Sequence, residues 1–379
     1  MQAFELKLSV NLIFGRGTVS QVGRVAGGLG RRALIVTGRS SARTGALAAV
    51  TDRLEASGLK WVLFDRVRAN PLTTTVMEGA EEARRENCDL VIGLGGGSPM
   101  DAAKAVAFMA VNPGHINDYV FGDKSGDRAL PLVAVSTTAG TGSEMDRYAV
   151  VTDPETRGKK SLKSPAVYPI FSIVDPELMY SLPPAMIAAT GFDAFSHALE
   201  ALLSPLSSPL SEMVSLEAVR LISRHLPLVF KESGNRDSWD FLAWGNCLGG
   251  WAIDLAGVGP IHGLEHPVSG LLGVTHGEGL AALTGPVLKI TADYSGDKFE
   301  KAALAMDGPW RKSEDLIPAL EVLLERLALK LKLSDLGVKE GQIDWLAENA
   351  LATNGFALGN SHHPGLERDT LKKILSEAF

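Results

Sequence analysis

Four side chains in the second half of the sequence have the types and the spacing to hold one divalent metal ion: Asp193, His197, His262 and His276. Asp193 and His197 are four residues apart in a run typical of a helix, so both would project from one helix face. Three imidazoles and a carboxylate suit Fe²⁺ or Zn²⁺ and leave positions open for an oxygen-bearing substrate. Singly, each residue could equally be a buried polar group satisfied by hydrogen bonds. Together, they favour a metal site.

Three consecutive glycines at 95–97 separate an expected strand at 89–94 from an expected helix at 100–109. Without Cβ atoms, the backbone there can approach a ligand closely. Ser98 can cap the helix, and the free N–H groups of the first turn, together with the helix dipole, would bind a pyrophosphate. The run is not a GxGxxG fingerprint, so a simple tight turn is the alternative.

A second loop of small residues, 136–144, follows the expected strand 132–135 and is rich in Ser, Thr and Gly. Its hydroxyl groups and flexible backbone suit contacts with sugar and phosphate at the carboxyl end of a parallel sheet. The alternative is an ordinary turn of Ser and Thr residues.

Composition limits the class of protein. The chain has 379 residues, 45% of them hydrophobic, and a net charge of −7 without a Lys/Arg run, which argues against nucleic acid or an anionic membrane as partner. Cys88 and Cys247 form neither a disulfide framework nor a thiolate metal site. No secretion signal and no apolar run of membrane-spanning length is found, so we expect a cytoplasmic protein.

The elements that must position these residues change character near residue 180. Before it, apolar strands alternate with helical patterns, which predicts a Rossmann-like parallel sheet covered on both faces (domain 1–180). The expected strands are 32–37, 61–64, 89–94 and 132–135, and the expected helices are 45–57, 73–86 and 100–109. After Pro183 and Pro184 we expect an all-helical domain (181–379), with segments at 185–203, 209–230, 238–256 and beyond 297.

These motifs, taken in order, resemble the iron-containing (group III) alcohol dehydrogenases, whose relatives include lactaldehyde reductase, 1,3-propanediol dehydrogenase and glycerol dehydrogenase. The resemblance covers nearly the whole chain. It is carried by the segments Phe14-Gly15-Arg16-Gly17, Asn70-Pro71, Gly95 to Asp101, Thr137 to Glu144, Asp175-Pro176, Gly191 to His197, His262 to Pro267 and His276-Gly277.

The resemblance implies a dehydroquinate synthase-like fold, in which a dinucleotide domain joins a helical metal domain and the active site lies between them. It implies hydride transfer between a nicotinamide and a small alcohol or aldehyde, with Asp193, His197, His262 and His276 as metal ligands and His266 as a nearby histidine that moves the proton. Asn70 would lie near the reacting end. The remaining cofactor contacts implied are Gly95, Gly96, Gly97, Ser98, Asp101, Thr137, Thr138, Thr141 and Ser143.

One departure from the family concerns cofactor choice. Many NAD-using relatives carry an acidic residue just after the first cofactor-domain strand, where it would repel a 2′-phosphate; this chain has Gly38, followed by Arg39 and Ser40. We therefore expect NADP(H) to be preferred over NAD(H). A second departure follows Glu144, where the family usually has a Thr two residues on and this chain reads Met145-Asp146-Arg147-Tyr148. Tyr148 and Ile253 are candidates for shaping the substrate pocket. His362 and His363 could edge the site, although a surface loop fits them better.

Other readings stay open at this point. A dehydroquinate synthase-type cyclase shares the fold but uses a Glu and two His as metal ligands. A glycerol dehydrogenase-type enzyme would oxidise polyols. A metal storage module would need no nucleotide-binding loop. By analogy with relatives, we expect a homodimer or a higher homo-oligomer, with the strand around 5–14 as a contact.

Overall fold

The computed structural model describes residues 9–379, which divide into two compact units. Among the described residues, one unit contains 9–138 and 142–181, and the other contains 139–141 and 182–379. The short segment 139–141 is part of the second unit, although the residues before and after it in the sequence are part of the first. Residues 5–8 of the expected amino-terminal strand lie outside the described residues, and its role in an oligomer stays a prediction.

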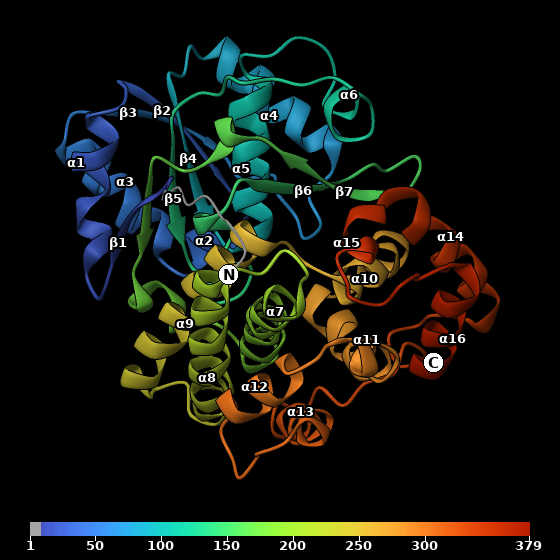
Figure 1. Ribbon diagram of the computed structural model, residues 1–379. Coiled ribbons are helices and arrows are strands. Elements are labelled where there is room, and N and C mark those ends of the chain that lie inside the picture. The colour runs from blue at the N-terminus through green and yellow to red at the C-terminus, as the bar shows by residue number, and fades with distance from the viewer. Residues whose placement is uncertain (1–8) are drawn as a thin grey trace. The chain divides into compact units, whose positions relative to one another are not determined.

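The first unit is built on a six-stranded sheet whose strands are all parallel, in the order β1-β8-β5-β4-β2-β3 (Figure 1). The strands are β1 (Asn11–Phe14), β2 (Arg32–Thr37), β3 (Lys60–Phe64), β4 (Leu90–Gly95), β5 (Leu132–Ser136) and β8 (Phe171–Val174). Their continuous Val, Ile and Leu runs suit strands that are buried on both faces. The predicted parallel-sheet domain is confirmed.

Helices cover both faces of this sheet, because successive side chains of β2 point to opposite faces and pack in different cores. Leu34 and Val36 pack in one core with α4 (Thr73–Arg85) and α5 (Gly97–Met109). Ala33 and Ile35 point to the other face and pack with α1 (Val22–Gly27) and α3 (Ala46–Ala56). The short helices α2 (Ser40–Arg43) and α6 (Asn117–Val120) complete the unit.

Two features of this unit were not predicted. An antiparallel hairpin joins β6 (Tyr148–Thr152) to β7 (Lys159–Lys163), and β8 adds a sixth strand to the sheet between β1 and β5. The β7 sequence is Lys-Lys-Ser-Leu-Lys, whose charge hides the apolar alternation on which strand prediction depends. The hairpin carries Lys159, whose Nζ bonds Asn70 Oδ1.

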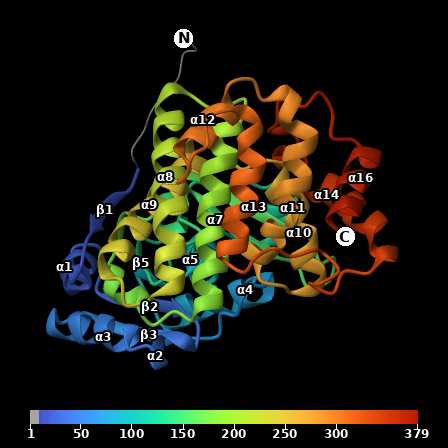
Figure 2. The ribbon, with the colours of Figure 1, turned by 90° about the horizontal axis from the view of Figure 1, so that it is seen from below.

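The second unit is helical, and residues 182–379 contain no strand. Its long helices α7, α8 and α9 pack against one another, as Figure 2 shows. Pro184, Pro209 and Pro260 each occupy the first turn of a helix, where the missing N–H costs nothing. The helices are α7 (Pro184–Leu203), α8 (Pro209–Lys231), α9 (Arg236–Ala256), α10 (Pro260–Leu272), α11 (His276–Thr291), α12 (Lys298–Ala305), α13 (Leu316–Arg326), α14 (Ile343–Thr353), α15 (Gly355–Gly359) and α16 (Arg368–Ala378). The predicted helical region is confirmed.

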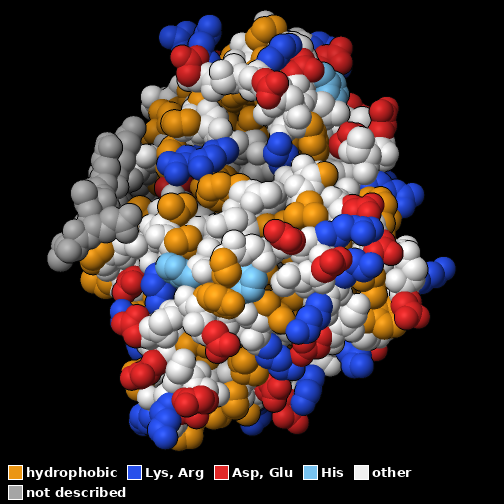
Figure 3. All heavy atoms as spheres, turned by 45° about the vertical axis from the view of Figure 1, so that its right-hand side comes forward, with side chains coloured by type: hydrophobic (Ala, Val, Ile, Leu, Met, Phe, Trp, Pro, Cys, Tyr) orange, Lys and Arg blue, Asp and Glu red, His pale blue; other side chains and the backbone are white. Residues whose placement is uncertain are grey.

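The surface carries charges of both signs. Basic and acidic side chains are interspersed on the face drawn in Figure 3, in keeping with the modest net charge of −7. Among the described residues, none of the helices combines the length and the apolar character needed to cross a lipid bilayer.

Candidate functional site

Three helices of the second unit carry the four residues proposed as metal ligands. Asp193 and His197 lie one turn apart on α7, His262 lies near the start of α10, and His276 is the first residue of α11. Gly277 allows α11 to begin against α7, because a Cβ at this position would come within 1.9 Å of the Ala189 carbonyl oxygen. The close approach of the two backbones places His276 beside Asp193.

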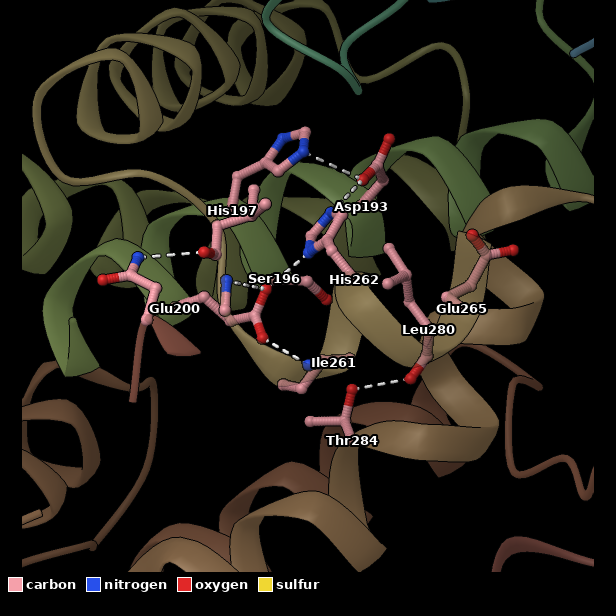
Figure 4. Close-up of polar contacts among 12 residues, drawn as sticks. Asp193, Ser196, His197, Glu200, Ile261, His262, Glu265, Leu280 and Thr284 are labelled. Carbon is pink, nitrogen blue, oxygen red and sulfur yellow. Dashed lines mark hydrogen bonds and ion pairs between the residues drawn. The ribbon is translucent and has the colours of Figure 1, made fainter. Parts of the chain in front are cut away.

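The donor atoms converge on one carboxylate oxygen. Asp193 Oδ1 lies 3.4 Å from His197 Nε2 and 3.4 Å from His262 Nε2 (Figure 4). It also lies 3.7 Å from His276 Nε2. Ligand atoms about 2.1 Å from a common ion at a tetrahedral angle would lie roughly 3.4 Å apart. The donor atoms of Asp193, His262 and His276 all lie within 4.8 Å of one another, close enough for one divalent ion, and His197 adjoins this group through Asp193.

A second carboxylate orients His262. Glu200 Oε2 accepts a hydrogen bond from His262 Nδ1 at 2.5 Å, and the same side chain accepts from the backbone N–H groups of Gly259 at 2.9 Å and Ile261 at 2.6 Å. Figure 4 shows Glu200 on the opposite side of the His262 ring from Asp193. With Nδ1 bonded to Glu200, Nε2 is the nitrogen that faces the Asp193 oxygen, 3.4 Å away.

The His276 ring is held in the same way. Its Nδ1 hydrogen-bonds Glu265 Oε2, and Glu265 is fully buried on α10, where it also accepts from Ser269 Oγ at 3.2 Å. The remaining ring, His197, stacks on His262 with centroids 4.6 Å apart. Two of the three candidate imidazole ligands thus have a carboxylate partner that fixes the ring orientation.

Electrostatics favour the ligand form of Asp193 and His197 but place a proton on His262 as long as no cation is bound. Burial alone would raise the pKa of Asp193, but the surrounding histidines hold it well below its usual range. Burial lowers the pKa of His197 to about 3. For His262 burial works in the same direction, yet Glu200 and Asp193 outweigh it and raise the pKa to about 9. A bound cation would replace the positive charge that these carboxylates otherwise draw from a proton.

His266 lies on α10, one turn after His262, as its spacing predicted. Its ring is 6.4 Å from the His262 ring and nearly perpendicular to it, and 5.6 Å from the His276 ring. Its Nδ1 hydrogen-bonds Asn354 Oδ1 at 3.0 Å. His266 is therefore beside the candidate ligands and is oriented by an amide rather than by a carboxylate.

Three further histidines of the second unit, His225, His362 and His363, have separate surroundings. His225 stacks on Phe241 and contacts Ser238. His363 packs edge-on against Tyr294, and His362 is exposed in the loop after α15. The loop position agrees with the interpretation of His362 and His363 as surface residues.

In the first unit, three candidate cofactor loops follow adjacent parallel strands. Gly38 comes directly after β2, Gly96 after β4 and Thr137 after β5, and the order β5-β4-β2 makes these strands neighbours. The carboxyl ends of parallel strands meet at one sheet edge, which is where α/β domains bind nucleotides.

Helix α5 begins at Gly97, three residues earlier than the predicted start at Met100. Gly96 is the N-cap and Gly97 the first helical residue, so the expectation that Ser98 caps the helix is wrong. Gly95, at φ 148°, permits the turn, and a Cβ on Gly96 would lie 2.8 Å from Thr138 Oγ1. The first-turn N–H groups of Gly97 and Ser98 have no acceptor within the helix, which leaves them oriented for an anion.

Two further predicted cofactor residues, Asp101 and Ser143, bond to each other. Ser143 Oγ donates to Asp101 Oδ1 at 2.7 Å, and the Val150 N–H donates to Oδ2 at 3.1 Å. Burial raises the pKa of Asp101 even though Lys104 lies nearby. Asp101 therefore ties the second loop and β6 to α5, a contact that holds loop geometry.

Asp146, in the segment that departs from the family pattern, anchors the same region. It accepts from Lys104 Nζ at 2.7 Å and from the Tyr148 N–H at 2.7 Å, and both members of this ion pair are buried. Burial raises the pKa of Asp146 to about 7. The departure thus supplies a buried partner for Lys104 rather than an exposed polar group. Tyr148 lies on β6, and Ile253 is buried on α9, so neither position tests their predicted role in a substrate pocket.

Lys159 is a buried partner of Asn70 that the sequence did not reveal. It is buried on β7, and its Nζ donates to Asn70 Oδ1 at 3.0 Å. Asn70 adopts a left-handed conformation with φ 52°, which its short polar side chain tolerates. Because 89 residues separate the two in the sequence, no local pattern could have paired them.

The residues proposed to select the cofactor lie at the end of β2. Gly38 is buried, and a Cβ there would lie 3.0 Å from the Val67 carbonyl oxygen. Arg39 and Ser40 follow at the start of α2, and both are exposed. In the segment assigned to the second unit, Gly140 packs on Thr190 of α7, next to Thr141.

Comparison with known proteins matches both halves of the chain to one family. Residues 9–176 match the domain described as iron-containing alcohol dehydrogenase, and residues 187–379 match the C-terminal domain of the Fe-containing alcohol dehydrogenase family. The 1,3-propanediol dehydrogenase of Klebsiella pneumoniae is 34% identical over 375 residues, which cover 97% of this chain and 96% of the relative. The lactaldehyde reductase of Escherichia coli strain K12 is 31% identical over 348 residues, which cover 89% and 90%.

A solved structure supports the same assignment. NADH-dependent butanol dehydrogenase A from Thermotoga maritima superposes with a TM-score of 0.91 at 30% identity, covering 100% of this chain and 99% of that one. The matches give no support to the cyclase, polyol or storage alternatives. The chain therefore belongs to the iron-containing alcohol dehydrogenase family of oxidoreductases.

Proposed function

We propose that this protein interconverts a small alcohol and its aldehyde by hydride exchange with NAD(P)(H), using a divalent ion, Fe²⁺ with Zn²⁺ as the alternative, held by Asp193, His197, His262 and His276. The observation that carries the proposal is the convergence of three imidazole nitrogens on Asp193 Oδ1 at 3.4 to 3.7 Å. Family membership supplies the reaction class, and these residues supply the chemistry.

When bound, the ion would polarise the substrate oxygen and the nicotinamide would exchange hydride with the substrate carbon. The protein's own side chains have three tasks. Glu200 and Glu265 keep the Nε2 atoms of His262 and His276 turned inward. His266 would hold and return the proton of the hydroxyl group. The N–H groups of Gly97 and Ser98 would receive the pyrophosphate.

We further propose that NADP(H) is used in preference to NAD(H). The relatives do not support this choice: a butanol dehydrogenase is described as NADH-dependent, a methanol dehydrogenase as NAD-dependent, and a sulfoacetaldehyde reductase structure contains NAD+. The proposal rests on this chain's own residues after β2, where buried Gly38 offers no carboxylate and exposed Arg39 and Ser40 offer donors to a 2′-phosphate.

Anaerobic purification, metal analysis and an assay with a panel of short aldehydes would test the function. We expect NADPH consumption that continues over many turnovers, which a cyclase that recycles its cofactor would not give. Asp193→Ala should remove both the bound ion and the activity, whereas His225→Gln, on α8 and bonded to Ser238, should retain both. Aldehyde reduction by metal-free Asp193→Ala would overturn the proposal.

The cofactor arm of the same assay compares kcat/KM for NADPH and NADH. We expect a ratio above one, and Arg39→Ala should lower it by about tenfold, the effect of removing one charged hydrogen bond of about 1.5 kcal/mol. A strong preference for NADH would contradict the NADP(H) proposal without touching the assignment of the metal ligands.

A further inference from the structure

His266 receives its orientation from a residue 88 positions further along the chain. His266 Nδ1 and Asn354 Oδ1 are 3.0 Å apart, and both residues are more than nine-tenths buried. Asn354 lies between α14 and α15, where its backbone N–H bonds the Ala350 carbonyl and its own carbonyl accepts from Leu358. The amide is thus anchored from both sides against α10.

The surrounding hydrogen bonds assign which end of the Asn354 amide faces His266. Thr353 Oγ1 donates its single proton to the Asn349 carbonyl oxygen at 2.7 Å. It can therefore only accept from Asn354 Nδ2, which lies 2.8 Å away. With the amide nitrogen turned to Thr353, the amide oxygen faces His266.

An oxygen acceptor at this distance requires a proton on His266 Nδ1. In the neutral ring the other nitrogen, Nε2, then carries the lone pair. His262 and His276 have the same Nδ1 arrangement, but their partners are the carboxylates of Glu200 and Glu265. The amide of Asn354 orients its ring without adding a negative charge, which suits a proton carrier that is not a ligand.

We propose that Asn354 is a positioning residue that holds His266 in the Nδ1–H tautomer and thereby leaves the lone pair on Nε2, the nitrogen that would take and return the substrate proton. The inference rests on the proposed function for its consequence, although the tautomer itself can be measured separately. Thr353 supports this positioning, because its hydroxyl group fixes which end of the Asn354 amide faces His266.

The first test reads the tautomer directly and does not need activity. Long-range ¹H–¹⁵N correlation spectra of [¹⁵N]histidine-labelled protein, metal-free and zinc-loaded, would show which His266 nitrogen carries the proton, with His266→Gln used to assign the signals. We expect Nδ1–H in the unaltered protein and a shift toward Nε2–H in Asn354→Ala. A His266 ring that is protonated only on Nε2 in the unaltered protein would overturn the proposal.

The second test measures the consequence. Asn354→Ala should lower kcat by roughly 10- to 100-fold, part of the 10²- to 10⁴-fold that general acid–base catalysis contributes, while KM changes by less than about twofold and metal content is kept. Asn354→Asp keeps an acceptor and should recover much of the loss. Thr353→Val should be slower than Thr353→Ser, which retains the hydroxyl group.

The two tests separate the possible failures. An Nδ1–H ring in a protein that reduces no aldehyde would reject the proposed function and leave the tautomer assignment standing. An Asn354→Ala protein with the shifted tautomer and unchanged kcat would reject the positioning role. Loss of metal or a lowered melting temperature in Asn354→Ala, without rescue by Asn354→Asp, would make Asn354 a structural residue only and would likewise reject the role.

Discussion

Single side chains determine whether the imidazoles of the second unit can serve as ligands. A free histidine ring can present either nitrogen, and a metal site needs the correct one to be turned inward. Glu200 provides this for His262, and Glu265 provides it for His276. Glu200 also accepts two backbone N–H groups, so its charge is well solvated by the protein although the residue is buried.

Glu200→Gln should weaken metal binding by about 10- to 100-fold, the usual cost of removing the partner of a ligating histidine. The amide has one acceptor oxygen, and it cannot serve Gly259, Ile261 and His262 together. Competition with a chelator of known affinity would measure the change. The control is Glu217→Gln, which is exposed on α8 beside Arg220 and should bind metal as the parent does. Equal affinities for the two variants would show that Glu200 does not orient a ligand.

At the scale of elements, the sequence predicted those features that depend on residues close together in the chain. The apolar strands of the sheet were recognisable because burial on both faces leaves an uninterrupted run of Val, Ile and Leu. The pair Asp193 and His197 was recognisable because helical spacing alone places both on one face. The charged strand β7 and the polar partnership of Lys159 with Asn70 escaped prediction, since both depend on contacts between distant segments.

The exact ends of helices were the other feature that the sequence did not predict. The sequence placed Ser98 at the cap of α5, whereas two glycines allow the turn to close earlier and Gly96 takes that position. Asp101, which the resemblance implied as a cofactor contact, bonds Ser143 and Val150 through its two oxygens, and its contact with the cofactor stays a prediction. Propensity indicates that a turn is present, and packing decides which residue begins the helix.

The start of α11 is the element most sensitive to a small change. Gly277→Ala would place a methyl group 1.9 Å from the Ala189 carbonyl oxygen, so α11 must move away from α7 and carry His276 with it. We expect at least tenfold weaker metal binding and a destabilisation of about 1–3 kcal/mol, as for other overpacked sites. Gly341→Ala, where the new methyl group meets nothing within 4 Å, is the control. Denaturant unfolding and metal titration of both variants would decide, and normal metal binding by Gly277→Ala would refute the packing argument.

At the scale of the molecule, the two units differ in what should stabilise them. The first unit has its own two apolar cores, one on each face of the sheet, and its buried ion pair of Lys104 with Asp146. The second unit buries Asp193, Glu200 and Glu265 among four imidazoles. Grouping three carboxylates in a helical interior costs free energy unless positive charge accompanies them. We therefore expect the second unit to depend on its ion for stability.

Removal of the metal should lower the melting temperature of the second unit. An ion present at 100 times its dissociation constant, and bound only by the folded state, adds about 2.7 kcal/mol, which corresponds to roughly 5–10 °C for a unit of this size. Differential scanning calorimetry of the metal-loaded and chelated protein would measure the shift, and a transition that belongs to the first unit alone should stay in place. Asp193→Ala should show no response to added metal. If chelation leaves every transition of the parent protein unchanged, the buried carboxylates must be stabilised by the protein alone, and the metal-site assignment loses its energetic support.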